Sequence, residues 1–135
     1  MVDIFTHTAE EVEALTFEDA ALRRDNFTAM DEADLIAFAR AREATARYAW
    51  LPYMHNPALA HRLHRIKLPV TLIWGGSDRI NPAANAASYV AALPQARAEI
   101  LEGRGHFPHI EAPQAVAALI EGAARAALQT QTGAQ

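Results

Sequence analysis

Two loops in the second half of the sequence carry the residue types of acid–base chemistry. Asp78 follows the apolar run Leu68 to Trp74, and His106 follows the run Arg97 to Leu101. A carboxylate that bonds one imidazole nitrogen fixes the tautomer of the ring, so that the other nitrogen can act as a general base. On spacing alone, a purely structural role of both side chains in loop turns is an equal alternative.

The elements around these loops indicate how they are positioned. The first run has the composition of a short buried strand, and the second is a weaker strand candidate because it is short and contains two alanines. Asn81-Pro82 opens a predicted helix between them that ends near Leu93. Pro113 opens a final Ala-rich helix. Strand, helix, strand and helix in this order form a βαβα unit with parallel strands. Because the carboxyl ends of parallel strands meet at one edge of the sheet, we expect Asp78 and His106 to lie within reach of each other.

The first half of the sequence predicts short helices. Four candidate helix starts share a capping residue or a proline: Thr8 with Glu11, Thr16 with Asp19, Asp31, and Asn56-Pro57. The helix that starts at Asp31 is expected to reach about Tyr48, and the helix from Asn56 to reach about Arg65. In this half, only Val2 to Phe5 has the character of a strand.

Composition excludes several function classes. The chain has 135 residues, a formal net charge of −4 and no cysteine, and therefore no disulfide, thiolate metal site or Cys nucleophile. Residues 1–50 hold 11 acidic and 5 basic side chains, a balance that does not suit a phosphate backbone, so we expect no nucleic acid partner. Apolar runs are far shorter than the roughly 20 residues that cross a bilayer, and no signal peptide is recognised. We therefore expect no membrane partner and a cytoplasmic location.

The amino-acid sequences of the two loops point to a family. The stretches are Leu68-Pro-Val-Thr-Leu-Ile-Trp-Gly-Gly-Ser-Asp-Arg-Ile-Asn-Pro82 and Gly103-Arg-Gly-His-Phe-Pro-His-Ile-Glu-Ala-Pro113. Together they resemble the C-terminal end of the α/β-hydrolase superfamily. The resemblance implies that Asp78 is the acid and His106 the base of a catalytic triad. It further implies an α/β fold that is a partial α/β-hydrolase fold, with cap helices in residues 1–67 and the last two core strands in residues 68–135.

The activity implied by the resemblance is hydrolysis of a carboxylic ester, or of a related acyl or C–C bond, without a cofactor. Members of that family carry their nucleophile on a Gly-x-Ser-x-Gly elbow. The serines of this chain, Ser77 and Ser88, both lie outside such a motif. We therefore expect the chain to supply the acid and the base but not the nucleophile, and to be inactive alone.

A chain of this kind leaves the edge of a strand open. We expect this edge to pair with a complementary N-terminal half or with a second copy of the chain. The alternative function is a non-catalytic one, in which a truncated chain or a split-hydrolase subunit acts as the binding partner of an N-terminal half.

Further side chains have weaker patterns. Trp50, Tyr53 and Met54 form an aromatic and apolar cluster at the end of the predicted cap, where they pack in a core or line the pocket of a small ester-like substrate. A third hypothesis is a metal-binding module on three histidines, His55, His61 and His64, although a solvated surface explains them better. His109 either lines the pocket or, as we expect, makes structural bonds across its loop. Glu111 is expected to cap or brace the same loop, because acids favour helix N-termini.

Overall fold

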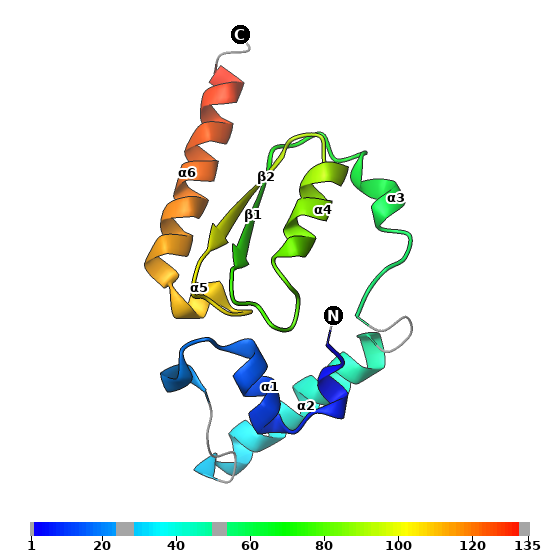
Figure 1. Cartoon of the computed structure of the whole chain (residues 1–135), viewed down its shortest axis with the longest axis vertical. Helices are drawn as coiled ribbons and strands as arrows, with labels where there is room; N and C mark the ends of the chain where they lie inside the picture. The colour runs from blue at the N-terminus through cyan, green and yellow to red at the C-terminus, as the bar shows by residue number, and fades with distance from the viewer. Residues whose placement is uncertain (1, 24–28, 50–53, 133–135) are drawn as a thin grey trace. The chain divides into compact units, whose positions relative to one another are not determined.

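The structure, a computed structural model, describes residues 2–23, 29–49 and 54–132 and forms two compact units (Figure 1). The larger unit combines Met1–Arg23 with Leu63–Gln135, and the smaller unit is Arg24–Arg62. This division differs from the predicted boundary after residue 67, because the first 23 residues group with the part that contains the sheet. The role of residues 1–67 as a cap stays a prediction.

The centre of the larger unit is a parallel pair of strands, β1 (Val70–Gly75) and β2 (Ala96–Leu101). Val70 pairs with Ala96 and Gly75 pairs with Leu101, so both strands end at the same level of the sheet. The β-branched and aromatic side chains of β1 suit a pleated, half-buried surface. Both predicted strands and their parallel pairing are confirmed.

Helices flank this sheet on both sides (Figure 1). α4 (Ala84–Ala92) contacts β2, and α6 (Pro113–Thr132) contacts β1. The helix expected from Asn81 begins three residues later, at Ala84. One helix was not expected: α5 (Pro108–Glu111) is a single turn, too short to have a periodic sequence pattern. The buried apolar side chains of the larger unit include Phe17, Leu63, Ile80, Ala86, Leu93 and Val116. The predicted βαβα unit is confirmed.

The N-terminal part of the larger unit contains η1 (Ile4–Thr6), α1 (Ala9–Thr16) and η2 (Ala20–Leu22). The predicted capping box opens α1: the hydroxyl of Thr8 accepts the backbone N–H of Glu11 at 3.2 Å, and the Glu11 carboxylate accepts the backbone N–H of Thr8 at 2.7 Å. The hydrogen bonds from the Thr8 backbone and then from its hydroxyl lower the pKa of the Glu11 carboxyl below its usual value.

Two local predictions in this part are wrong. The expected strand character at the start of the chain is replaced by η1, because the Asp3 carboxylate accepts the backbone N–H of Phe5 at 2.9 Å and closes a turn. Thr16 ends α1 rather than opening a second helix. The next turn, η2, is capped by Asp19, whose carboxylate accepts the backbone N–H of Ala21 at 2.9 Å.

The smaller unit contains α2 (Glu32–Ala49), which confirms the long helix predicted from Asp31. The Asp31 carboxylate accepts the backbone N–H of Asp34 at 2.8 Å in the first turn. The helix predicted from Asn56 is much shorter than expected and is limited to α3 (Ala60–Leu63), which ends in the larger unit. The Asn56 side chain accepts the backbone N–H of Ala58 at 2.9 Å and so forms a turn ahead of α3.

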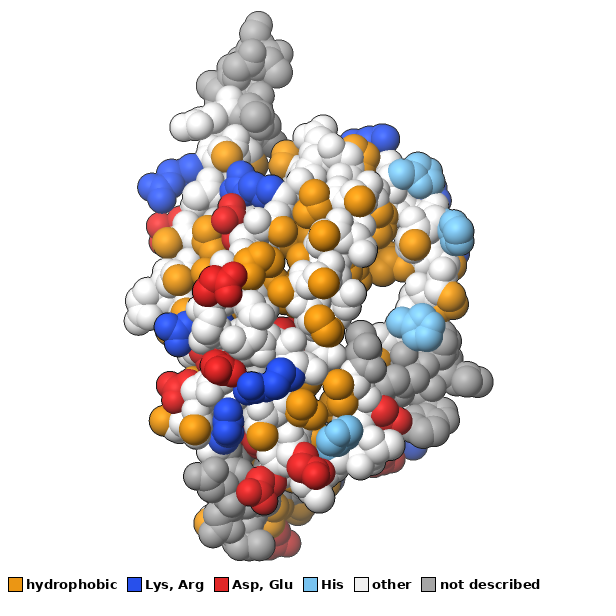
Figure 2. All heavy atoms as spheres, in the orientation of Figure 1, with side chains coloured by type: hydrophobic (Ala, Val, Ile, Leu, Met, Phe, Trp, Pro, Cys, Tyr) orange, Lys and Arg blue, Asp and Glu red, His pale blue; other side chains and the backbone are white. Residues whose placement is uncertain are grey.

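Several apolar side chains of the larger unit lie on its surface (Figure 2). Leu68, which precedes β1, and Ile120, on α6, are each more than half exposed. Among the residues that the structure describes, no helix is both long enough and apolar enough to span a membrane.

Candidate active site

Asp78 lies in the loop that follows β1, and bonds within this loop hold it. Its Oδ1 accepts the backbone N–H of Ile80 at 2.9 Å and that of Asn81 at 2.7 Å. Trp74 braces the same loop, because its indole N–H donates to the carbonyl oxygen of Asn81 at 2.8 Å. The side chain of Asp78 is only 4% exposed. Its carboxylate is therefore buried and has a defined orientation.

The loop that carries His106 is joined to the Asp78 loop through the backbone. The N–H of Ser77 donates to the carbonyl oxygen of Arg104 at 2.9 Å. Gly75 allows this close approach, because a Cβ there would lie 1.9 Å from the carbonyl oxygen of Gly105. The two loops therefore meet backbone to backbone where the strands end.

This junction brings Asp78 and His106 together. His106 Nδ1 lies 2.8 Å from Asp78 Oδ2, and because an ionised carboxylate only accepts, the ring donates its Nδ1–H. The imidazole is 31% exposed, against 4% for the carboxylate. In the part of the chain that the structure describes, Asp78 is the one hydrogen-bond partner of the ring, which leaves Nε2 available. The predicted proximity of the two side chains is confirmed.

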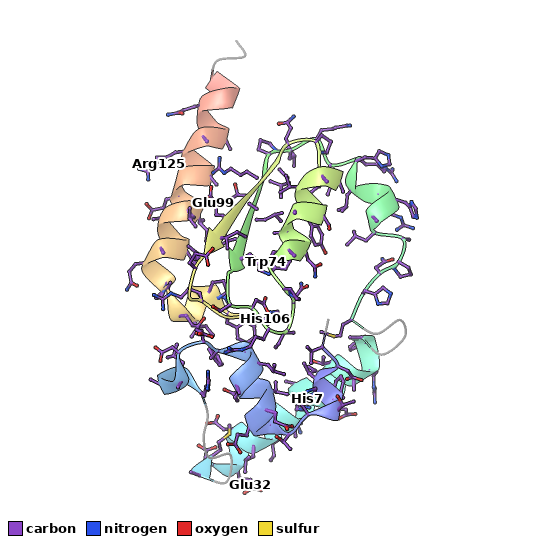
Figure 3. All side chains as sticks on the ribbon, in the orientation of Figure 1. His7, Glu32, Trp74, Glu99, His106 and Arg125 are labelled. Atoms are coloured by element: carbon purple, nitrogen blue, oxygen red, sulfur yellow. The ribbon has the colours of Figure 1, made fainter. Side chains whose placement is uncertain are left out.

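A hollow of about 200 Å³ opens beside this pair. Ile73, Trp74 and Pro108 line it together with Asp78 and His106. Figure 3 shows Trp74 and His106 at the ends of the two strands. A reacting group in the hollow would therefore contact apolar side chains and the acid–base pair at the same time.

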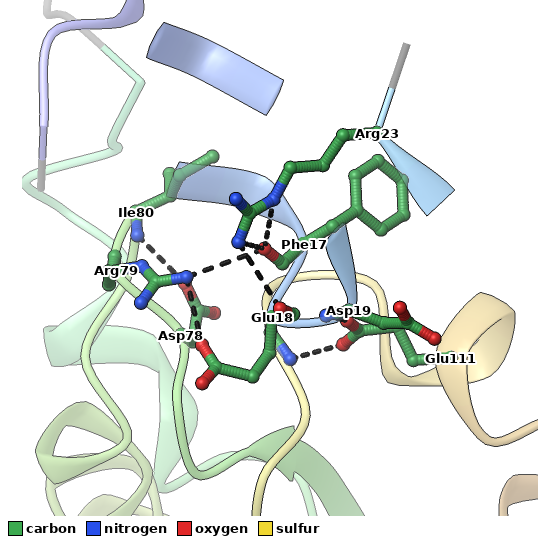
Figure 4. A network of polar contacts seen from close by, with 9 residues as sticks. Phe17, Glu18, Asp19, Arg23, Asp78, Arg79, Ile80 and Glu111 are labelled. Atoms are coloured by element: carbon green, nitrogen blue, oxygen red, sulfur yellow. Dashed lines mark hydrogen bonds and ion pairs between the residues drawn. The ribbon is translucent and has the colours of Figure 1, made fainter. Parts of the chain in front are cut away.

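The segment Thr16–Asp19 contacts both loops, which no local sequence pattern indicates (Figure 4). The carbonyl oxygen of Thr16 accepts the backbone N–H of His106 at 2.7 Å. On the acid side, Arg79, the residue after Asp78, forms an ion pair with Glu18 at 2.8 Å. The N-terminal part of the larger unit is thus a third element of the site, and it was missed because its contacts join residues far apart in the sequence.

The other predicted site residues lie elsewhere. Trp50 and Tyr53 fall outside the residues that the structure describes, and Met54 belongs to the smaller unit, with a left-handed φ of 49°. Substrate contact by these three side chains stays a prediction. His109 lies in α5, with its ring centroid 5.6 Å from that of Phe107. Its structural role stays a prediction.

The histidines of the metal hypothesis do not lie in a cluster of possible metal ligands among the described residues. Among the residues that the structure describes, no three His, Cys, Asp or Glu side chains come together in a group able to hold a metal ion. His55, His61 and His64 are all described and all exposed, as expected of a solvated surface.

Comparison with known proteins identifies the family. The sequence matches the Alpha/beta hydrolase family over residues 3–119, which is most of the chain. The chain belongs to the alpha/beta hydrolase family. The two parallel strands with their flanking helices form part of the family fold, which confirms the predicted fold class.

Curated relatives match a shorter region of the chain. The uncharacterized proteins Mb2734 of Mycobacterium bovis and Rv2715 of Mycobacterium tuberculosis are each 39% identical to it over 54 residues. These residues are 40% of this chain and 16% of each relative. The match thus covers a small fraction of the curated relatives' length.

Two solved structures share the fold. A membrane phospholipase A, described as a bacterial virulence factor, has a TM-score of 0.61 and 21% identity, over 87% of this chain and 37% of that chain. The α/β hydrolase MGS-MChE2, from the metagenome of lagoon sediments at Mar Chica, Morocco, has a TM-score of 0.51 and 22% identity, over 70% of this chain and 45% of that chain. The chain therefore spans less than half of either structure.

Proposed function

We propose that this chain supplies the acid and the base of a hydrolase that cleaves a carboxylic ester or a related acyl or C–C bond. In this proposal Asp78 is the acid and His106 is the base. The observation that carries it is the 2.8 Å contact between Asp78 Oδ2 and His106 Nδ1, which leaves the Nε2 of a part-exposed ring available. The proposed chemistry uses no cofactor.

The geometry suits proton transfer at Nε2. With its Nδ1–H donated to Asp78, the ring of His106 presents an Nε2 lone pair that can take the proton of an attacking hydroxyl group. The buried carboxylate then stabilises the imidazolium, which returns the proton to the leaving group. The difference in exposure agrees with these roles, because the base must reach the reacting atoms and the acid must not.

The nucleophile and the oxyanion hole are assigned to a segment that this sequence does not contain. Ser77 lies in the loop junction and Ser88 lies within α4, and neither belongs to a Gly-x-Ser-x-Gly elbow. The hollow beside His106 is the place that we assign to the incoming nucleophile. We expect the chain alone to hydrolyse no ester.

Complementation tests this proposal. The chain is mixed with the nucleophile-bearing N-terminal part of a family member, and hydrolysis of a chromogenic ester is measured. We expect His106→Ala to lower the rate by about 1,000-fold or more, because the general base is lost. His64→Ala, a change of the same residue type at an exposed position outside the site, is the control and should keep the rate. Equal rates for the chain and His106→Ala would remove His106 from the mechanism.

We further propose that the open edge of β1 pairs with that N-terminal part or with a second copy of the chain. The N–H groups of Val70 and Gly76 donate to the carbonyl oxygens of Gln95 and Leu101, on the side of β2. Because alternate residues of a strand turn their N–H groups to opposite edges, those of Thr71 and Ile73 face away from β2. Within the described residues, no third strand covers this edge.

Amide hydrogen exchange and light scattering test the pairing. Addition of the N-terminal part should protect the amides of Thr71 and Ile73, while that of Val70, already bonded, should change little. A dimer with the same two amides protected would support self-association instead. Binding without hydrolysis would favour the alternative function, a split-hydrolase subunit whose role is to bind its other half.

A further inference from the structure

Glu111 joins two backbone segments that are distant in the sequence. One carboxylate oxygen accepts the backbone N–H of Asp19 at 2.8 Å, across a separation of 92 residues. The other oxygen accepts the backbone N–H of Gly105, the residue immediately before His106. The predicted bracing role of Glu111 is confirmed, and the brace extends beyond its own loop to the N-terminal part of the unit (Figure 4).

The segment on the other side of this brace also holds His106 directly. The backbone N–H of His106 donates to the carbonyl oxygen of Thr16 at 2.7 Å. A Cβ at Gly105 would lie 2.3 Å from the same carbonyl oxygen, so the two backbones are in contact. Phe17 is buried and packs edge-on against Phe107, with 5.7 Å between the ring centroids. The backbone at Gly105 and His106 and the side chain of Phe107 therefore all contact Thr16 or Phe17.

The same segment reaches the acid loop through Glu18, whose carboxylate pairs with Arg79 at 2.8 Å. Arg79 also lies 3.4 Å from the carbonyl oxygen of Phe17. Asp78, the neighbour of Arg79, is thus linked to the surface against which Glu111 holds the histidine loop. Loss of the Glu111 bonds would let the histidine loop move relative to the Asp78 loop and would therefore disturb the Asp78–His106 contact.

We propose that Glu111 is a positioning residue that sets the His106 ring against Asp78 by tying the backbone of Gly105 to residues 16–19. Glu111 does not contact the reacting atoms; it acts through the Gly105 backbone on the next residue. The proposal rests on the assignment of His106 as the base, and it adds that residues 1–23 take part in orienting that base. Loss of the carboxylate frees the Gly105 and Asp19 amides and lets the imidazole leave the carboxylate of Asp78.

Nuclear magnetic resonance of the full chain, without any assay of hydrolysis, tests the positioning. Glu111→Ala removes both acceptors, and Glu111→Gln keeps one carbonyl oxygen. Glu121→Gln is the control, because this glutamate of α6 pairs with Arg125 on an exposed face, away from the two loops. The readouts are the His106 Nδ1–H resonance and the exchange rates of the Gly105 and Asp19 amides.

We expect Glu111→Ala to broaden or abolish the Nδ1–H resonance and to speed exchange of the two amides by about tenfold or more, because each loses a bond to a charged acceptor. Glu111→Gln should give a smaller effect of the same kind, and Glu121→Gln none. An unchanged Nδ1–H resonance in Glu111→Ala overturns the proposal. So does faster exchange that is uniform over β1, β2 and α6, since this marks a general loss of stability. Should the alanine variant unfold, the glutamine variant decides by the same criteria.

The complemented enzyme gives a second readout. Glu111→Gln should lower kcat by about tenfold and leave KM unchanged, because the base is misplaced while substrate binding is kept. A change confined to KM would contradict the positioning role. If His106→Ala leaves hydrolysis intact while the Nδ1–H resonance still depends on Glu111, the assignment of the base fails and the positioning contact stands.

Discussion

The acid loop and the histidine loop meet at one edge of the sheet, but they are held in different ways. Asp78 is fixed by its own loop, since its carboxylate accepts N–H groups two and three residues further along the chain. His106 is fixed by the carbonyl oxygen of Thr16 at the end of α1, and its neighbour Gly105 is fixed by Glu111. One loop organises itself, and the other depends on the tertiary structure.

This difference follows from what each side chain is expected to do. One oxygen of a buried carboxylate can accept nearby N–H groups while the other oxygen accepts the imidazole N–H. The proposed base must keep Nε2 free, so the ring itself cannot be tied down on both sides. Its orientation therefore has to come from the backbone, and a glycine-rich loop needs outside contacts to hold that backbone.

Gly75→Ala should have the largest effect on stability, because it pushes the acid loop and the histidine loop apart. The new Cβ would lie 1.9 Å from the carbonyl oxygen of Gly105 and 2.4 Å from that of Arg104, both of them backbone atoms. We expect the free energy of unfolding, measured by urea titration, to fall by about 3 kcal/mol or more. Gly122→Ala is the control, because no described atom outside the neighbouring backbone of α6 lies within 4 Å of the added Cβ, and it should gain about 0.5–1 kcal/mol from helix propensity. Equal losses in both variants would contradict the close approach at Gly75.

Asp78→Ala should have the next largest effect, because it removes the internal support of the acid loop. The backbone N–H groups of Ile80 and Asn81 lose their acceptor, and we expect the free energy of unfolding, measured by urea titration, to fall by about 2 kcal/mol. Asp78→Asn keeps an amide oxygen for these two bonds, so its loss should be less than half as large. Similar losses in the two variants would place the stabilising effect in the contact with His106 rather than in the loop.

The smallest expected effect is a pH dependence of stability that arises in α1, the helix whose last residue, Thr16, bonds the backbone of His106. Bonds from Thr8 lower the pKa of Glu11 in the folded chain, so this stabilisation is present above the unfolded pKa and is lost as the pH falls through the acidic range. Thermal melts between about pH 6 and pH 3 should therefore show a steeper loss of stability for the chain than for Glu11→Gln. Glu10→Gln, in the same turn of α1, is the control and should follow the chain; a slope unchanged by Glu11→Gln would rule out the effect.

Elements with strong local patterns were predictable from the sequence. The apolar run of β1, the capping box of Thr8 and Glu11, and the proline that opens α6 each depend on a few neighbouring residues, and all three are confirmed. Weak local patterns led to wrong predictions. Asn56 forms a turn instead of opening a long helix, because its side chain bonds a backbone N–H two residues ahead.

The sequence by itself determined the βαβα unit, and with it the edge at which Asp78 and His106 meet. Parallel strands must end at a common edge, so spacing and strand composition were enough to predict that approach. Only the tertiary structure decided how the histidine is held. The backbone N–H of His106 bonds the carbonyl oxygen of Thr16, and the Glu111 carboxylate bonds the backbone N–H groups of Gly105 and Asp19. The backbone partners of these bonds leave no trace in residue type, because every residue except proline carries the same N–H and C=O groups.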